Sequence, residues 1–549
     1  MRGCLAVSCL LVLGLPVAAQ EVPGGGIGAE ALSRHVAELS SDAYAGRAPA
    51  TDGERRTVDY LVAQFKRDGL QPGGERGGWT QDVTLVRAEV QGQPVATVRV
   101  GGQASTWRNG EDVTLQSLYP ATHIALQDAP LVFVGYGVNA PERHWDDYKG
   151  VDLAGKVAVV LINDPDFETP QPGAFDGKGM TYYGRWTYKY EELARKGAAG
   201  VLIVHETAPA AYGWATVKSS GTSPLFDIPR DNAAQYHTRL RGWLQRDAAV
   251  ALFKHAGLDF EALKAKAQRA DFKPVELGDA RLSTVFEVKR EQVTSHNVIA
   301  KLPGAQRPSE SVIYSAHWDA YGIGAPDEAG DAVRHGAVDN ATGVAAVLEL
   351  ARVFAAGPRP ARTTLFMALT AEEKGLLGAT YYAAHPLMPL ARTAAVINIE
   401  MLSPDGPTRD IASWGRGRVS LEHDLAMAAK ARGKAYSPDP NLEAGFFYRA
   451  DHFAFAQKGV PAITVGAGLD RVDGGVAKGK ALRDAYFARC YHQPCDKVTA
   501  RWDASGQAQD VTILYDLGRD IANGDAWPVW QADSEFSGAR AASADARTD

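Results

Sequence analysis

Residues 363–384, TTLFMALTAEEKGLLGATYYAA, contain the pattern that decides the fold. Thr363 to Leu369 form a short, largely apolar run of the kind that predicts a buried strand. Leu376 to Ala384 have the apolar spacing of a helix, and the turn between the two runs holds the adjacent acids Glu372 and Glu373. A buried strand that leads through a turn into a helix is the repeating unit of an α/β sheet.

The same alternation of strands and helices continues on both sides of this unit. We expect further strands at 312–316, 394–399 and 462–465, and a helix at 342–356. Elements in this order predict an α/β fold with a doubly wound, mixed sheet covered by helices on both faces.

The chain before residue 295 divides into two parts. Residues 20–119 have helical spacing at 29–39 and 55–67, and we assign them to the same domain as the 279–530 sheet. Residues 120–278 are expected to form a smaller α/β unit, because strand-like runs at 131–134, 155–162 and 201–204 flank a helical segment at 190–196. The last residues, 531–549, are small, polar and alanine-rich, which predicts a disordered tail.

Length and composition are those of a globular protein with more than one domain. A chain of 549 residues is too long for one ordinary core, and 45% apolar with 22% charged residues is an average balance. The net charge of −7 offers no basic surface for nucleic acid. No apolar run reaches the ~18 residues of a membrane span. We therefore expect neither nucleic acid nor, once the leader is removed, a membrane as a partner.

The first 19 residues have the pattern of a signal peptide. Arg2 precedes an apolar stretch from Cys4 to Val17, and Val17-Ala18-Ala19 is a small-residue cleavage site. This predicts a secreted or periplasmic protein. Cleavage would leave two cysteines, Cys490 and Cys495, for which a local disulfide is expected and a pair of free thiols is the alternative.

Acidic and histidine side chains follow the predicted strands on the side where open α/β sheets bind ligands. These residues are His317, Asp319, Asp339, the Glu372–Glu373 pair and Glu400. Imidazole and carboxylate groups are zinc ligands, and two ions need one shared carboxylate. Adjacent glutamates are explained if one binds metal and the other accepts a proton. Asp319, two residues after His317, would orient the imidazole of that ligand.

Each of these motifs alone also has a plain structural explanation, such as a helix cap or a solvated helix start. The ordered set, however, resembles the co-catalytic zinc aminopeptidase and glutamate carboxypeptidase family. The motifs that carry the resemblance are His317-Trp318-Asp319, Gly336 to Gly343, Ala371 to Gly375, Asn398 to Met401 and Tyr491-His492. Residues 120–278 resemble the protease-associated domain that many members insert. The resemblance spans nearly the whole chain after residue 19.

The resemblance implies two zinc ions per chain, with the metal ligands His317, Asp339, Glu373, Glu400 and His492. His317 and Glu400 would complete one site, Glu373 and His492 the other, and Asp339 would bridge both. A cis peptide bond often follows the bridging aspartate, which here would be Asp339–Asn340.

The catalytic roles implied by the resemblance fall on Glu372 as general base and Tyr491 as a hydrogen-bond donor to the oxyanion. Together they imply a zinc aminopeptidase that hydrolyses the N-terminal bonds of peptide substrates through a metal-bound hydroxide. Two departures stand out, because Glu400 replaces the more common aspartate and Ala450 precedes Asp451-His452 where a serine is usual. Asp451 would then be a pocket residue or a helix cap, and Asp496 a turn or cap residue.

Three other functions share this fold. A carboxypeptidase would need a basic cluster for the terminal carboxylate, for which Arg416 and Arg418 are candidates. A glutaminyl cyclase has the same fold and most of the ligands, but the inserted domain argues against it. A receptor-like binding protein would have lost the metal site, whereas all five ligand positions here carry competent side chains.

Overall fold

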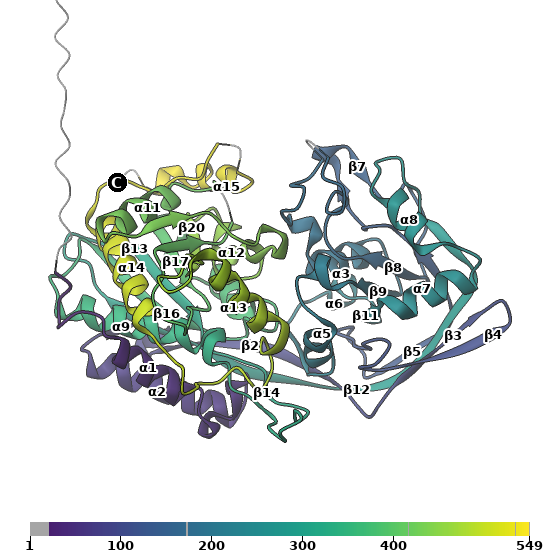
Figure 1. Ribbon diagram of the computed structural model, residues 1–549, viewed down its shortest axis with the longest axis horizontal. Coiled ribbons are helices and arrows are strands. Elements are labelled where there is room, and N and C mark those ends of the chain that lie inside the picture. Colours follow the sequence, from purple (N-terminus) through teal and green to yellow (C-terminus); the bar gives the residue numbers. More distant parts are fainter. Residues whose placement is uncertain (1–20, 172–173, 416, 533, 548–549) are drawn as a thin grey trace, which may run out of the picture.

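The computed structural model describes residues 21–171, 174–415, 417–532 and 534–547. The expected signal peptide at 1–19 lies outside these ranges. Figure 1 shows two lobes joined at the bottom of the view by the 28-residue strand β12 (Val275–Leu302). The larger lobe consists of residues 21–90 and 289–547, and the smaller lobe of residues 91–288.

The larger lobe is built on one mixed sheet. β16 runs parallel to β13, β13 to β17 and β17 to β20, while β12 and β18 run antiparallel to their neighbours β16 and β20. This confirms the predicted doubly wound α/β class. In spatial order its strands are β12, β16 (Arg362–Leu369), β13 (Arg307–His317), β17 (Thr393–Ile399), β20 (Ala462–Ala467), β18 (Asp410–Ser413) and β19 (Ala435–Ser437).

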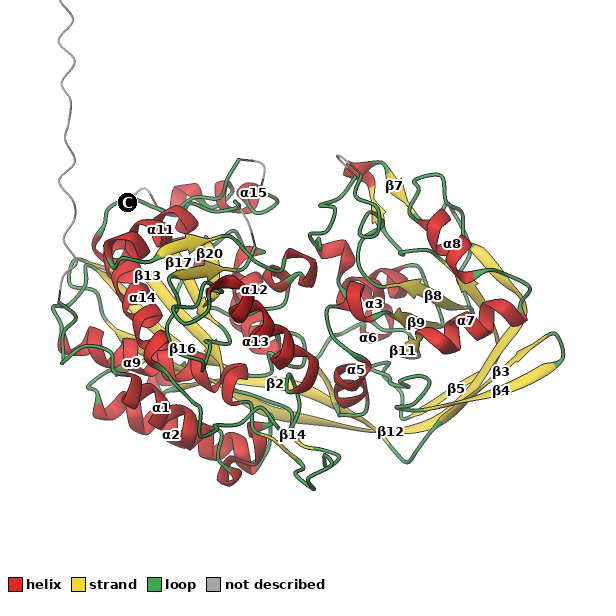
Figure 2. Cartoon of the chain, in the orientation of Figure 1, coloured by secondary structure: helices red, strands yellow, loops and turns green. Residues whose placement is uncertain are grey.

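Helices cover both faces of this sheet (Figure 2). Alternate side chains of β13 point to opposite faces: Val312 and Tyr314 pack in one core and Ile313 in another. The first core is closed by α1 (Ala29–Leu39), α2 (Asp52–Arg67), α9 (Thr342–Ala356), α11 (Leu421–Ala431) and α14 (Ser505–Asn523). The second is closed by α10 (Leu377–Ala384) and α12 (His452–Ala456). The strands are therefore buried on both sides, which fixes the positions of their ends.

The smaller lobe has its own parallel sheet of β11 (Leu240–Gln245), β9 (Gly200–His205), β8 (Val157–Leu161) and β5 (His123–Phe133). One face packs on α7 (Arg246–His255) and α8 (Phe260–Ala267), and the other on α3 (Trp186–Arg195) and α5 (Trp214–Gly221). A smaller α/β unit is thus present, and its likeness to a protease-associated domain stays a prediction.

The two lobes meet along antiparallel strands rather than at a simple linker. β3 (Val95–Val100) pairs with β12 and with β4 (Gln103–Arg108), whereas β2 (Thr80–Val90) pairs with the second half of β12. Ala96, Val98 and Trp107 belong to the core of the smaller lobe. The boundary expected at residue 120 therefore lies too late, because the smaller core already draws on this hairpin.

Short elements complete the chain. They are β1 (Gln71–Pro72), β6 (Asn139–Ala140), β7 (Trp145–Asp146), β10 (Leu225–Asp227), β14 (Gly322–Ile323), β15 (Val333–Arg334), α4 (Thr207–Ala210), α6 (Ala233–Tyr236), α13 (Gly475–Arg489) and α15 (Ser537–Ala541). None of the helices in the described ranges has the length and hydropathy that crossing a membrane requires.

The C-terminal segment differs from the disordered tail expected at 531–549. Phe536 is buried and packs against Trp530 and Phe447, and the guanidinium of Arg540 in α15 donates to the carbonyl of Thr393. Two buried anchors in a polar, alanine-rich stretch are enough to hold it on the larger lobe.

Candidate metal centre

The predicted ligand residues converge at the carboxyl ends of the parallel strands. His317 is the last residue of β13, Glu373 lies in the turn after β16, and Glu400 directly follows β17. Asp339 lies in the turn before α9, and His492 follows α13. Five residues that are up to 175 positions apart in sequence (from 317 to 492) therefore share one edge of the sheet.

A glycine shapes the turn that carries Asp339. Gly336 has φ +57°, and a side chain there would bring its Cβ to 2.5 Å from the carbonyl oxygen of Asp339. The Asp339–Asn340 peptide bond is cis, as the resemblance implied. The close approach of the chain at Gly336 keeps this turn tight, and the Asp339 carboxylate lies between the two histidines.

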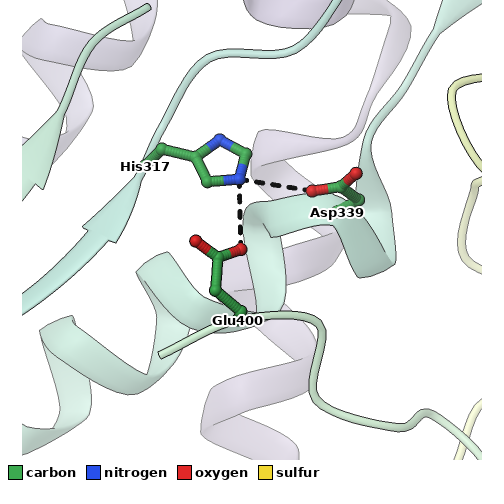
Figure 3. Close-up of side chains that lie close together, drawn as sticks. All are labelled: His317, Asp339 and Glu400. Atoms are coloured by element: carbon green, nitrogen blue, oxygen red, sulfur yellow. Dashed lines mark ion pairs between the residues drawn. The ribbon is translucent and has the colours of Figure 1, made fainter. Parts of the chain in front are cut away.

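His317, Asp339 and Glu400 form the first cage (Figure 3). The Nε2 atom of His317 lies 3.2 Å from Oδ1 of Asp339 and 3.3 Å from Oε2 of Glu400. The other oxygen of Glu400, Oε1, accepts a hydrogen bond of 3.1 Å from the Asn398 amide. That bond turns Oε2 toward the imidazole, so the longer side chain of Glu400 still reaches the cage.

Asp339, Glu373 and His492 form the second cage. Nε2 of His492 lies 3.2 Å from Oδ2 of Asp339 and 3.1 Å from Oε2 of Glu373. Asp339 thus presents one oxygen to each cage, which is the geometry of a bridging carboxylate.

The spacing of the nitrogen and oxygen atoms in both cages fits a zinc site. Ligands at about 2.0–2.1 Å in a tetrahedral site lie roughly 3.3 Å apart, close to the nitrogen–oxygen distances in both cages. Neither nitrogen of His492 nor Oε1 of Glu373 has a hydrogen-bond partner among the described residues, although all three atoms are buried. Buried polar atoms normally have partners, so the convergence of atoms without them fits a site for a cation.

The carboxylates of the cages also favour bound cations, as the pKa values of the two histidines show. Burial alone would lower the pKa of His492, but Glu373 and Asp339 raise it to about 9. Burial alone would also lower the pKa of His317, but the charges of Glu400 and Glu372 raise it well above its ordinary value. Such a concentration of carboxylates stabilises positive charge, which two divalent ions would supply.

Asp319 supports the centre differently from what the sequence suggested. Its carboxylate accepts the backbone N–H groups of Glu372 and Glu373, at 3.0 and 3.3 Å. The Nδ1 atom of His317 contacts the main-chain carbonyl of Asp319 at 3.1 Å, whereas the nearest carboxylate oxygen is 3.7 Å away. Asp319 therefore fixes the turn of the glutamate pair with its side chain and the imidazole with its backbone.

Asp496, expected to be a turn or cap residue, has a more specific position. It is buried, and its two oxygens accept the backbone N–H groups of Val338 at 2.8 Å and Asp339 at 3.1 Å. The hydroxyl of Tyr486 donates to the same carboxylate at 3.2 Å. Asp496 thus holds the backbone of the bridging residue from behind.

We expect Asp496→Asn to weaken zinc binding about 10- to 100-fold, the usual effect of losing a partner that orients a metal ligand. An amide has one acceptor oxygen, so one of the two backbone N–H groups loses its bond. Asp410→Asn is the matched control, because Asp410 also accepts backbone N–H groups, from Leu469 and Asp470, but is not part of either cage. Competition with a zinc chelator measures both affinities, and equal affinities in the two variants would contradict this role of Asp496.

Glu372 and Tyr491 adjoin the cages without belonging to them. The carboxylate of Glu372 lies 3.9 Å from Nε2 of His317. Burial raises the pKa of Glu372 well above its ordinary value, against the opposing charge of His317, so cations in the cages are needed to keep it ionised. The ring of Tyr491 stacks on His492 with centroids 3.7 Å apart. The hydroxyl of Tyr491 accepts a hydrogen bond of 2.9 Å from Arg449.

A disulfide joins Cys490 to Cys495, as expected, and brackets His492. Ser219 in α5 of the smaller lobe donates to the carbonyl of His492 at 3.4 Å. The segment that carries the last ligand is therefore held both by a covalent loop and by the neighbouring lobe.

Asp451, expected to be a pocket residue or a helix cap, precedes α12 but does not cap it with its side chain. It is fully buried, and neither carboxylate oxygen has a hydrogen-bond partner among the described residues.

Sequence reasoning missed two arginines near the centre. Arg449 donates to the hydroxyl of Tyr491, and Arg185 precedes α3 of the smaller lobe. No local pattern marks these two residues, because their neighbours come from distant parts of the chain.

The basic cluster considered for a carboxypeptidase lies elsewhere. Arg418 pairs with Glu535 at 2.7 Å and covers the rings of Phe447 and Tyr448, so it is a packing residue. Arg416 lies outside the described residues.

Comparison with known proteins agrees with this geometry. Residues 297–515 match the model of peptidase family M28. The chain is 32% identical over 224 residues to a probable zinc metalloprotease of Pyrenophora tritici-repentis, which covers 39% of this chain and 49% of the relative. It is 25% identical over 315 residues to leupeptin-inactivating enzyme 1 of Streptomyces exfoliatus, covering 56% of this chain and 65% of the relative. The chain thus spans less than two thirds of either relative.

Solved structures show the same fold at low sequence identity. An aminopeptidase from Aneurinibacillus sp. strain AM-1 superposes with a TM-score of 0.54 at 20% identity, over 90% of this chain and 94% of that one. The zinc aminopeptidase BSAP from Bacillus subtilis has a TM-score of 0.50 at 17% identity, over 94% and 98% of the two chains. All the residues of both cages lie between positions 297 and 515, within the part of the chain that matches the model of peptidase family M28.

Proposed function

We propose that this chain is a zinc aminopeptidase that hydrolyses the N-terminal bond of peptide substrates, and that it is secreted or periplasmic. The observation that carries the proposal is the pair of cages that share Asp339, with Glu372 beside them and outside both. Zinc bound there would polarise the scissile carbonyl and make a water molecule more acidic.

The chain's own residues divide the proton transfers between them. Glu372 accepts the proton of the attacking water and returns it to the leaving amine, which requires it to be ionised at the start. The oxygen of Tyr491 accepts the Arg449 N–H, so its own hydroxyl proton is directed to another acceptor. A substrate carbonyl bound beside His492 provides that acceptor, and its developing charge strengthens the bond.

Specificity for a free amino terminus follows from an excess of carboxylates. Besides the three ligand carboxylates, the half-buried Glu372 and the fully buried Asp451 lie at the centre. Burial first, then the charges of Glu400 and Asp319, raise the pKa of Asp451 well above its ordinary value. Carboxylates in this environment favour a cation nearby. The ammonium group of a peptide is such a cation, whereas a carboxylate placed at the same position would be repelled.

A second cavity suits the side chain of the first substrate residue. It has a volume of about 350 Å³ and lies against Val338 and Met401, which adjoin Asp339 and Glu400 in sequence. Trp414, Phe446 and Phe487 also line it. We therefore propose a preference for apolar N-terminal residues.

Two observations support export. The first 19 residues have a signal-peptide pattern, and the Cys490–Cys495 disulfide is of a kind that persists in oxidising compartments. Expression of the full chain with fractionation and N-terminal sequencing tests this. A protein that retains Met1 in the cytoplasmic fraction would contradict it.

Hydrolysis of leucine p-nitroanilide by the purified protein tests the activity. We expect turnover that is abolished by a zinc chelator and restored by added zinc, and no turnover of the N-acetylated substrate. Cleavage of N-acetylated peptides with a free C-terminus would show a carboxypeptidase. Conversion of N-terminal glutamine to a pyroglutamyl ring would show a cyclase.

A further inference from the structure

A cavity of about 530 Å³ lies between the lobes beside the metal centre. Glu373, Tyr491 and His492 line it from the larger lobe, and Trp186, Tyr190 and Arg241 line it from the smaller lobe. Sites for small molecules measure roughly 300–1,000 Å³, so this space suits a short peptide better than a long chain.

Two guanidinium groups near this cavity have no anionic partner. Arg449 lines it and donates to the hydroxyl of Tyr491 at 2.9 Å and the carbonyl of Ala444 at 3.3 Å. Arg185 is only 7% exposed, and its Nε atom has no hydrogen-bond partner among the described residues. Neither group forms an ion pair with a carboxylate in the described ranges.

Two other arginines on the same wall are paired with carboxylates. Arg195 contacts Glu192 at 2.8 Å, and Arg230 contacts Asp227 at 2.9 Å.

Arg241 also lines the cavity and has no ion pair among the described residues, but its guanidinium group lies over the ring of Tyr190, 4.3 Å from the centroid. Among the unpaired groups that line the cavity, Arg449 is the one that contacts Tyr491 beside the metal centre.

Arg449 lines the cavity, and the guanidinium group of Arg185 lies 5.9 Å from the ring centroid of Trp186, which lines it too. The charges of both act on Tyr212, Tyr491 and Glu372. Burial, and next the charge of Arg449, lower the pKa of Arg185 to about 10. A buried cation that is repelled by a second positive group is costly unless an anion joins them.

The position is created by the contact between the lobes. Arg185 immediately precedes α3 of the smaller lobe, and Arg449 comes shortly before α12 of the larger lobe. The lobes are held together here by a backbone hydrogen bond of 3.0 Å from Met180 to Leu442 and by the ring of Tyr182 against Tyr448 and Phe453.

We propose that Arg185 and Arg449 bind the C-terminal carboxylate of a short peptide substrate, so that the enzyme acts on di- and tripeptides. The inference rests on the proposed aminopeptidase function and names its substrate class. Arg449 contacts Tyr491, which stacks on the ligand His492. Residues of an extended peptide are about 3.8 Å apart, so a terminal carboxylate one or two residues beyond the scissile bond falls in this region.

A carboxylate on a substrate side chain offers the same chemistry from a different source. The test therefore compares Leu-Ala with Leu-Ala amide, and Leu-Glu amide with Leu-Gln amide. We expect the wild-type protein to prefer Leu-Ala over its amide about 10- to 100-fold in kcat/KM, as charge-assisted hydrogen bonds provide. We expect no comparable preference between the other two substrates. A preference confined to Leu-Glu amide would overturn the C-terminal assignment, and no preference in either pair would overturn the site.

Variants assign the preference to the two arginines. Arg185→Gln and Arg449→Gln should each reduce the acid-to-amide ratio about 10-fold or more. The ratio cancels any effect that Arg449→Gln has on Tyr491, because both substrates are affected equally. Arg195→Gln, which removes a paired arginine from the same cavity, should leave the ratio unchanged. Arg185→Lys and Arg449→Lys retain a charge if the glutamine variants fold poorly, and should give intermediate ratios.

A binding measurement separates failure of this inference from failure of the proposed function. Calorimetric titration of the zinc-loaded Glu372→Gln variant with Leu-Ala and with Leu-Ala amide requires no turnover. Tighter binding of the free acid that disappears in the Arg185→Gln background supports the site even if the reaction differs from that proposed. Equal binding of acid and amide contradicts the site even if leucine p-nitroanilide is hydrolysed.

Discussion

Glu372→Gln is expected to lower kcat by about 10²- to 10⁴-fold and to leave the zinc content unchanged. The amide has nearly the same shape but cannot accept the proton of the attacking water. Glu372 belongs to neither cage, although its carboxylate is only 3.9 Å from the His317 imidazole. Its backbone N–H remains bonded to Asp319, so the turn should keep its conformation.

The adjacent variant Glu373→Gln is the matched control. Glu373 has the same neighbours in sequence, but its Oε2 atom belongs to the second cage, 3.1 Å from His492. Loss of zinc is therefore expected in Glu373→Gln and not in Glu372→Gln. Steady-state kinetics together with metal analysis of both proteins measure this, and near-normal kcat in Glu372→Gln would show that another group is the base.

Glu400→Ala is expected to lose one zinc ion per chain and nearly all activity. The first cage would keep only His317 and the shared Asp339, whereas the second cage would keep all three of its residues. Asp339→Ala should be more severe, because it removes one oxygen from each cage. Titration of the metal-free proteins with zinc should therefore give stoichiometries of about one for Glu400→Ala and near zero for Asp339→Ala.

The length of Glu400 gives a finer test of the same cage. Glu400→Asp withdraws the carboxylate by about 1.5 Å, while zinc coordination tolerates deviations of roughly 0.2 Å. It also removes the bond between Oε1 and Asn398 that orients the group. We expect Glu400→Asp to bind the first zinc weakly although aspartate is itself a zinc ligand. Two tightly bound ions in Glu400→Ala, with normal activity, would remove Glu400 from the cage.

Much of the larger lobe follows from local sequence pattern. The expected helix at 342–356 has the bounds of α9, and the strands expected at 363–369 and 394–399 each begin one residue earlier in the structure, as β16 and β17. The sequence alone could predict that the proposed ligands share one site, because parallel strands place their carboxyl ends at one edge of a sheet. His492 follows no strand, and the resemblance alone indicated its place.

Features of the structure that depend on distant residues could not be predicted from local sequence pattern. Asp496 accepts hydrogen bonds from residues 157 and 158 positions earlier, so its role is invisible in its own neighbourhood. β12 continues through residue 279, where the sequence suggested a boundary, because its two halves pair with strands of different lobes. Arg185 and Arg449 come from different lobes, and no periodicity in either segment encodes the contact between the lobes.

Anomalous diffraction at the zinc absorption edge, from crystals of the zinc-loaded protein, tests the central claim most directly. The two cages sharing Asp339 predict two peaks about 3.5–4 Å apart, one on each side of its carboxylate. One peak should lie beside His317 and Glu400, and the other beside Glu373 and His492. A single peak, or peaks away from these residues, would contradict the di-zinc centre proposed for this chain.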